Sequence, residues 1–187
     1  ENPNVVALYN EYHSKGLTNW LNEKQLETIN RRAYMLMSNL IGEKAANLEM
    51  TDSAGKPMPL YNIDAPYTVI CFWDPSCGHC KQEIPKLDSV YQASWKKQLV
   101  KIYAVLSEDT KPEWIKYTQE HQLTDWVHVY HSKEAEASEA AAQKPGFRQL
   151  YDITQTPTLY LLDNEKRIIA KKLNWQQLNE LLQVKWK

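Results

Sequence analysis

The chain has 187 residues, and its 22 Lys and Arg nearly balance its 23 Asp and Glu, giving a formal net charge of −1. This length suits one main domain with an elaboration, and a chain without basic excess is not typical of nucleic-acid or anionic-membrane binding. No apolar run approaches the roughly 20 residues of a membrane span, and three cysteines are too few for a disulfide scaffold.

The first 46 residues are expected to form a helical extension. A shorter helix is predicted over residues 5–13 and ends before Gly16, a typical stop. In the following helix, apolar residues recur at three- and four-residue steps on one face: Leu26, Ile29, Ala33, Leu36, Met37, Leu40 and Ile41. We expect this face to pack on the rest of the chain or on a second copy.

From residue 47 onward the pattern changes to alternating strands and helices. A hairpin is expected around the turn Ser53-Ala54-Gly55-Lys56. Strands are predicted at 67–73, 99–106 and 158–162, helices at 77–92, 113–122 and 176–184, and a turn at 163–166 leads into "RIIAKK". Two strand-to-helix crossovers followed by a hairpin and a helix indicate the α/β class, with a mixed β-sheet sandwiched by helices.

Two cysteines, Cys77 and Cys80, stand two residues apart where a predicted strand gives way to a helix. The unpaired N–H groups and dipole of a helix N-terminus favour a thiolate at Cys77, and the i, i+3 spacing puts the Cys80 sulfur beside it. Thiol-disulfide exchange needs one exposed attacking thiol and one resolving thiol. This pair supplies both roles, and a protonated His79 would further stabilise the Cys77 thiolate.

A C-x-x-C pair is also half of a zinc site. No second C-x-x-C or H-x-H pair is present in the sequence, so we expect neither a metal nor another cofactor. The third cysteine, Cys71, lies within a predicted buried strand and is expected to be an inert core residue.

The segment "FWDPSCGHCKQEIP" resembles the active site of TlpA/ResA-like thiol:disulfide oxidoreductases, which are thioredoxin-fold proteins of bacterial cell envelopes. The shared features are an Asp/Gly hairpin, Phe72-Trp73 at the end of a strand, the cysteine pair, and Pro85 five residues after the second cysteine. Further on, "QTPTLYLLD" matches the place where thioredoxin-like folds carry a cis-proline, here Pro157.

This resemblance implies a helical extension over 1–46, as in Bacteroidetes envelope proteins, and a thioredoxin-like domain over 47–187 with a surface insertion at about 126–146, Ala/Glu-rich and helical. It also implies a periplasmic or envelope-anchored enzyme that exchanges electrons with cysteine-containing client proteins and an upstream thiol partner. From the sequence alone, the opening Glu1-Asn2-Pro3-Asn4 fits a cytosolic chain or one whose targeting segment precedes Glu1.

Four residues receive roles from the resemblance. Pro157 would present the backbone of Thr156 to an extended client segment. Glu83, one turn beyond Cys80, would accept the Cys80 proton, the alternative being an ordinary solvated glutamate. Trp73 would exclude water beside the sulfurs.

Two features separate this chain from many relatives in that family. Ser76 replaces the aromatic residue common before the first cysteine, which implies a smaller apolar contact surface beside the site. Gly78-His79 resembles protein disulfide isomerase and not the Gly-Pro of thioredoxin, which leaves the direction of electron flow open; we expect a reductase, with an oxidase or isomerase as the alternative. A thiol peroxidase is one alternative, but such enzymes carry Thr or Ser three residues before the reactive cysteine, where this chain has Asp74. The other alternative is a non-catalytic module, which could hold copper.

Overall fold

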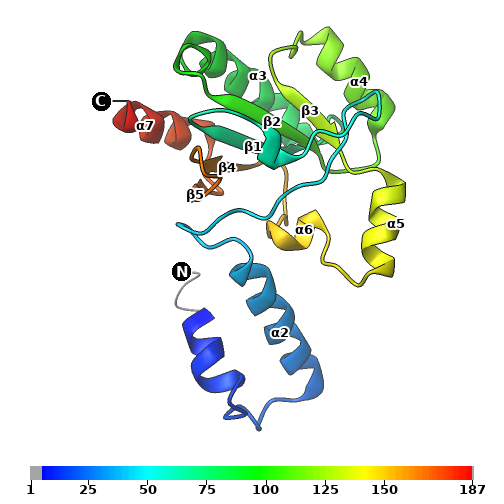
Figure 1. The fold of residues 1–187 in the computed structure, drawn as a ribbon, viewed down its shortest axis with the longest axis vertical. Coiled ribbons are helices and arrows are strands. Elements are labelled where there is room, and N and C mark those ends of the chain that lie inside the picture. The colour runs from blue at the N-terminus through cyan, green and yellow to red at the C-terminus, as the bar shows by residue number, and fades with distance from the viewer. Residues whose placement is uncertain (1–5, 187) are drawn as a thin grey trace.

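A five-stranded mixed sheet, in the order β3-β2-β1-β4-β5, forms the centre of the computed structural model, which describes residues 6–186 (Figure 1). The strands are β1 (Thr68–Trp73), β2 (Lys101–Leu106), β3 (Val127–Tyr130), β4 (Thr158–Leu162) and β5 (Ile168–Lys171). β1, β2 and β3 are parallel, whereas β4 runs antiparallel to β1 and β5. This arrangement confirms the predicted α/β class and the thioredoxin-like sheet.

The central strand β1 is buried on both faces, because its side chains alternate between two apolar clusters. Val69, Cys71 and Trp73 face one cluster, together with residues of α3 (Gly78–Ala93), α4 (Lys111–Glu120) and α7 (Trp175–Lys185). Ile70 and Phe72 face the other, which is covered by residues 45–63 and by the segment that follows α6 (Phe147–Leu150). No helix within residues 6–186 has both the length and the apolarity needed to cross a membrane.

The N-terminal extension contains α2 (Glu23–Met37), preceded by the short η1 (Tyr9–His13). Asn22 and Gln25 form a capping box that starts α2. The expected helix start at Val5 lies outside the described residues.

The extension is not helical throughout, which corrects the expectation that helix would reach residue 46. α2 ends at Met37, so Leu40 and Ile41 leave the helical stripe, and Gly42 adopts a φ of 89° that favours glycine. The next residues pair with the chain beside β5, where Gly42 N–H donates to Ile168 O at 2.8 Å and Ile168 N–H donates to Glu43 O at 2.9 Å. Covering this sheet edge satisfies backbone groups that would otherwise be unpaired.

The predicted hairpin around residues 53–56 is a tight reversal without regular strands. Asp52 N–H donates to Lys56 O at 2.9 Å, and Thr51 exchanges two backbone hydrogen bonds with Tyr130. The same segment therefore covers the β3 edge of the sheet.

The segment 126–146 contains a strand as well as the expected helix. α5 (Lys133–Ala141) has no buried residue and lies on the surface, but residues 127–130 form β3, parallel to β2. Their alternating Val-His-Val-Tyr sequence fits an edge strand, so treating the whole segment as a helical insertion is wrong.

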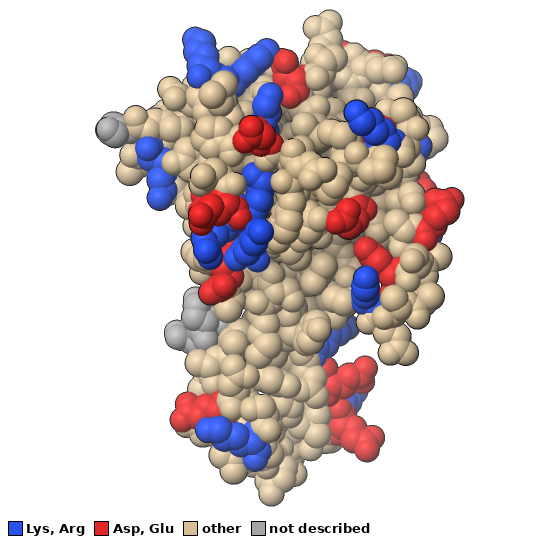
Figure 2. All heavy atoms as spheres, viewed as in Figure 1, with Lys and Arg blue, Asp and Glu red and all other residues tan. Residues whose placement is uncertain are grey.

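Charges of both signs are interspersed over the face shown in Figure 2, and no broad basic area dominates it. This distribution agrees with the near-neutral net charge of the chain.

Candidate active site

The cysteine pair lies at the start of α3, immediately beyond the carboxyl end of β1. Cys77 is the N-cap residue of α3, with extended backbone, and its thiol lies 3.5 Å from the carbonyl oxygen of Thr156. Cys80 is one turn into the helix and only 1% exposed, whereas Cys77 is half-buried. The more accessible thiol is therefore the one at the helix N-terminus, as the sequence predicts.

The surroundings separate the two thiols chemically. Burial opposes ionisation of Cys77, but hydrogen bonds from the Thr156 side chain and from the Cys80 and His79 backbone outweigh it and lower the Cys77 pKa. Burial raises the pKa of Cys80 to about 12. Cys77 is thus the more acidic of the two thiols.

This difference predicts selective alkylation of the reduced protein. Because the thiolate is the reactive form, a lowered pKa shifts the pH curve for Cys77 labelling below that of an unperturbed thiol. We expect iodoacetamide at pH 7 to modify Cys77 and spare Cys80, as read by peptide mass after a timed quench. Equal labelling of the two at pH 7, or a Cys77 midpoint above that of a free thiol, would contradict this assignment.

Asp74 is a residue of the site that the sequence did not identify. Asp74 is 1% exposed, and its carboxylate accepts hydrogen bonds from Ser76 N–H at 2.7 Å, from the Ser76 hydroxyl, and from the Thr110 hydroxyl at 2.6 Å. Cys77 N–H also donates to the Asp74 carbonyl at 3.3 Å. Asp74 thereby fixes the turn between β1 and the cysteines. Its position directly after a buried strand was a usable signal, whereas nothing near Thr110 in sequence indicated its role.

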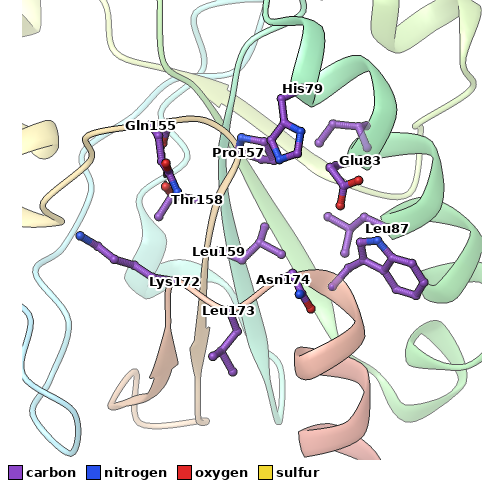
Figure 3. Close-up of a pocket in the computed structure, with 12 residues that line it drawn as sticks. His79, Glu83, Leu87, Gln155, Pro157, Thr158, Leu159, Lys172, Leu173 and Asn174 are labelled. Atoms are coloured by element: carbon purple, nitrogen blue, oxygen red, sulfur yellow. Dashed lines mark hydrogen bonds between the residues drawn. The ribbon is translucent and has the colours of Figure 1, made fainter.

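A pocket of about 140 Å³ opens at the start of α3, and His79, which lies between the two cysteines in sequence, is one of its lining residues (Figure 3). The side chains of His79 and Glu83 extend from α3, and the loop that leads into β4 lies opposite them. The peptide bond between Thr156 and Pro157 in that loop is cis, as the resemblance implied. The lining residues come from α3, this loop and the start of β4, and the turn into α7 with its first residue: His79, Glu83, Ile84, Leu87, Gln155, Pro157, Thr158, Leu159, Lys172, Leu173, Asn174 and Trp175.

The structure brings most of the predicted site residues to this region, but in different settings. His79 is exposed, while the Glu83 side chain is 19% exposed and pairs with Lys86 at 2.9 Å. Trp73 is fully buried and packs its ring 5.4 Å from that of Tyr117, in the same core cluster as Cys80. Trp73 therefore contributes to the floor beneath the pair and not to the pocket.

Cys71 is fully buried, and burial followed by the nearby Cys80 raises its pKa well above the ordinary value. Its setting is that of a core residue, in line with the expectation from sequence. Within residues 6–186, no three His, Cys, Asp or Glu side chains are grouped as a metal ion would require.

Comparison with known proteins places these features in a family. Over 141 residues the chain is 25% identical to the thiol-disulfide oxidoreductase ResA of a Bacillus cereus strain, covering 75% of this chain and 74% of ResA. A domain of a possible thiol-disulfide isomerase from Cytophaga hutchinsonii shares 37% identity and a TM-score of 0.66, covering 79% of this chain and 97% of that one. The thioredoxin domain of a thiol-disulfide oxidoreductase from Bacteroides vulgatus shares 25% identity and a TM-score of 0.64, and the match covers 78% of this chain and 96% of that one.

A family model described as AhpC/TSA matches residues 41–171. That range includes the whole sheet, the cysteine pair and the loop around Pro157. The chain therefore belongs to the AhpC/TSA family and is, at the level of its family, a thiol-disulfide oxidoreductase with a thioredoxin-like fold.

Proposed function

We propose that this protein reduces disulfides of client proteins through Cys77 and Cys80. The observation that supports the proposal best is the pairing of a half-buried, low-pKa thiol at a helix N-terminus with a buried thiol one turn further on. The first thiol can reach a client disulfide, and the second is shielded from it.

In the proposed cycle, the Cys77 thiolate attacks one sulfur of a client disulfide. A bond forms between Cys77 and that sulfur, the client disulfide breaks, and the leaving client sulfur takes up a proton. Cys80 then loses its proton and attacks the Cys77 sulfur, which releases the second client thiol. The client gains two electrons and two protons, and the enzyme is left with a Cys77–Cys80 disulfide, which an upstream thiol partner must reduce.

We assign supporting roles to residues around the pair. Thr156, whose carbonyl lies beside the Cys77 thiol, is the backbone edge for an extended client segment, with Pro157 shaping the adjoining pocket. Glu83 accepts the proton from Cys80 during resolution, which fits its half-buried place one turn further along α3. His79 tunes the thiolate, and Trp73 keeps water from the floor of the site.

We place this activity outside the cytoplasm, in the periplasm or at the cell envelope. The support is the resemblance to TlpA/ResA-like envelope proteins together with similarity to the Bacillus and Bacteroides thiol-disulfide oxidoreductases. An oxidising compartment is also where a reductase of protein disulfides finds its substrates.

The reduction potential of the Cys77/Cys80 pair tests both the activity and its direction. A stabilised thiolate favours the reduced form of the pair, and burial leaves Cys77 as the only thiol that can supply this stabilisation. We therefore expect a reduction potential near that of thioredoxin, about −270 mV. The protein is equilibrated in graded dithiol and glutathione buffers, and its alkylated thiols are counted by mass. Buried Cys71 should remain a thiol throughout and serves as an internal standard.

A potential of about −180 to −120 mV would contradict the reductase direction and favour an oxidase or isomerase. The absence of any reversible two-electron transition would overturn the proposed activity altogether.

A further inference from the structure

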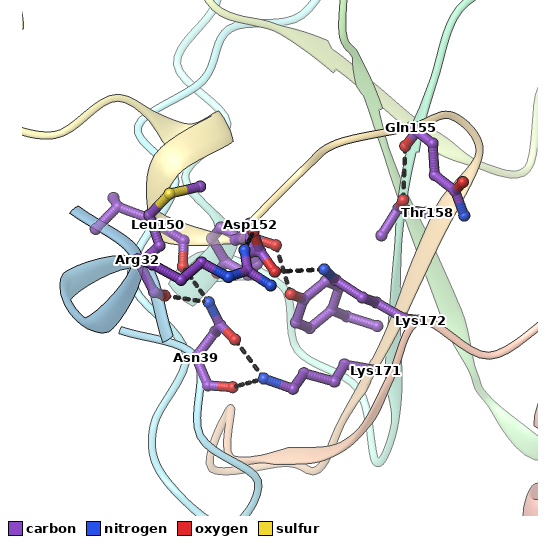
Figure 4. A network of polar contacts seen from close by, with 11 residues as sticks. Arg32, Asn39, Leu150, Asp152, Gln155, Thr158, Lys171 and Lys172 are labelled. Carbon is purple, nitrogen blue, oxygen red and sulfur yellow. Dashed lines mark hydrogen bonds and ion pairs between the residues drawn. The ribbon is translucent and has the colours of Figure 1, made fainter. Parts of the chain in front are cut away.

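A buried carboxylate links the N-terminal extension to the loops around the pocket. The Asp152 side chain is only 2% exposed and forms ion pairs with Arg32 of α2 and, at 2.5 Å, with Lys172 just after β5 (Figure 4). Burial opposes ionisation of Asp152, but hydrogen bonds from Lys172 and Arg32 outweigh it and lower its pKa. Asp152 is therefore a charged group whose burial depends on both cations.

The two loops that Asp152 joins form walls of the pocket that His79 and Glu83 also line. One runs from Asp152 itself to Pro157, and the other begins at Lys172 and leads into α7. Lys172 itself lines the pocket, and in Figure 3 its side chain points away from His79. Its ion pair with Asp152 therefore connects the two walls. Asp152 and Lys172 both have positive φ, 48° and 58°, which costs energy in residues with a side chain. Their ion pair helps to hold both loops in these conformations.

A second contact from the extension reaches the same two regions. Asn39, which is 1% exposed, donates from its side-chain amide to Leu150 O at 3.0 Å, just before Asp152 in the chain. Its backbone carbonyl accepts from Lys171 Nζ at 2.6 Å, just before Lys172. Asn39, two residues beyond the end of α2, thus contacts the last residue of α6 and the last residue of β5, close to where each loop begins. These contacts do not involve Arg32, and they help to fix where α2 lies.

We propose that Arg32 is a positioning residue for client binding, and that α2 acts through Asp152 to hold the two walls of the pocket in the shape that accepts an extended protein segment. The inference rests on the proposed function above and extends it, since it assigns part of client recognition to the N-terminal extension. It also defines the substrate class, because a protein disulfide must contact these walls and Thr156, whereas a small disulfide needs to reach only Cys77.

The test compares a protein disulfide with a small neutral one in the full chain. Reduced protein is mixed with insulin or with 2-hydroxyethyl disulfide, and the single-turnover rate is followed over a range of disulfide concentrations. For Arg32→Ala we expect the half-saturating insulin concentration to rise about tenfold. The rate with 2-hydroxyethyl disulfide should stay within about twofold of wild type.

Two variants make this result specific. Arg31→Ala removes the same charge from the neighbouring exposed residue of α2, which makes no ion pair within residues 6–186, and should behave as wild type. Arg32→Lys keeps a cation within reach of Asp152 and should restore most of the insulin affinity.

Equal losses with both disulfides would overturn the inference, because they would show a general effect on folding or on Cys77. Unchanged insulin kinetics for Arg32→Ala would also overturn it while leaving the proposed function intact. If wild-type protein turned over neither disulfide, the proposed function would fail and this inference with it.

Discussion

Replacing Cys77 by Ser is expected to lower the rate of client disulfide reduction by about 10³-fold or more, because loss of a catalytic nucleophile removes the step on which the others depend. A serine hydroxyl in the same place does not ionise near neutral pH, so the hydrogen bonds that lower the Cys77 pKa have no thiolate to stabilise. The measurement is the rate of insulin reduction with dithiothreitol as the electron source, corrected for the uncatalysed rate.

Cys80→Ser gives the complementary result. Without the resolving thiol, the mixed disulfide between Cys77 and the client should accumulate and be detectable by intact mass under non-reducing conditions. Cys71→Ala is the matched control, because it removes a cysteine from the same chain but from the buried strand, and it should retain exchange. Full activity in Cys77→Ser, or a mixed disulfide that forms on Cys80 instead, would show that the roles of the two thiols are assigned wrongly.

The part of the site that sequence predicts well is the part made by neighbours in the chain. A buried apolar strand followed at once by C-x-x-C places Cys77 at a helix N-terminus, because helix capping and i, i+3 spacing are local properties. β1 and β4 are also predictable for a local reason, since an uninterrupted apolar run is typical of a strand covered on both faces. Predicting that Pro157 lies near the cysteine pair required the resemblance to a known family, because the residues next to Pro157 in sequence do not indicate it.

The contacts that could not be predicted join distant segments. Arg32 and Asp152 are 120 residues apart, and neither lies in a pattern that distinguishes it from an ordinary surface charge. The early end of α2 has the same origin, because residues 42–45 leave a helical pattern to pair with the chain beside β5. In both cases tertiary contacts override what the local sequence favours.

Replacing Trp73 by Ala is expected to lower the free energy of unfolding by about 3–5 kcal/mol, the usual cost of truncating a fully buried aromatic side chain. Trp73 ends β1 with no exposed surface and packs against the rings of Tyr117 and His128. Removal of the indole leaves a cavity beneath the cysteine pair that the rigid sheet cannot close. Urea unfolding of the reduced protein, followed by circular dichroism, measures the change.

Trp73→Phe separates packing from polarity at this position. The Trp73 indole N–H is buried and finds no hydrogen-bond partner among residues 6–186, so replacing it with a phenyl ring removes an unsatisfied donor along with some apolar area. The two effects oppose each other, and we expect a net loss below about 1.5 kcal/mol. A loss from Trp73→Phe as large as that from Trp73→Ala would contradict this expectation, because it would show that a phenyl ring recovers none of the packing that the indole provides. The reduction potential of Trp73→Phe tests the proposed role of Trp73 in excluding water from the cysteine sulfurs. A potential that differs from that of the wild-type protein would show that the indole performs this role, and an unchanged potential would show that it does not.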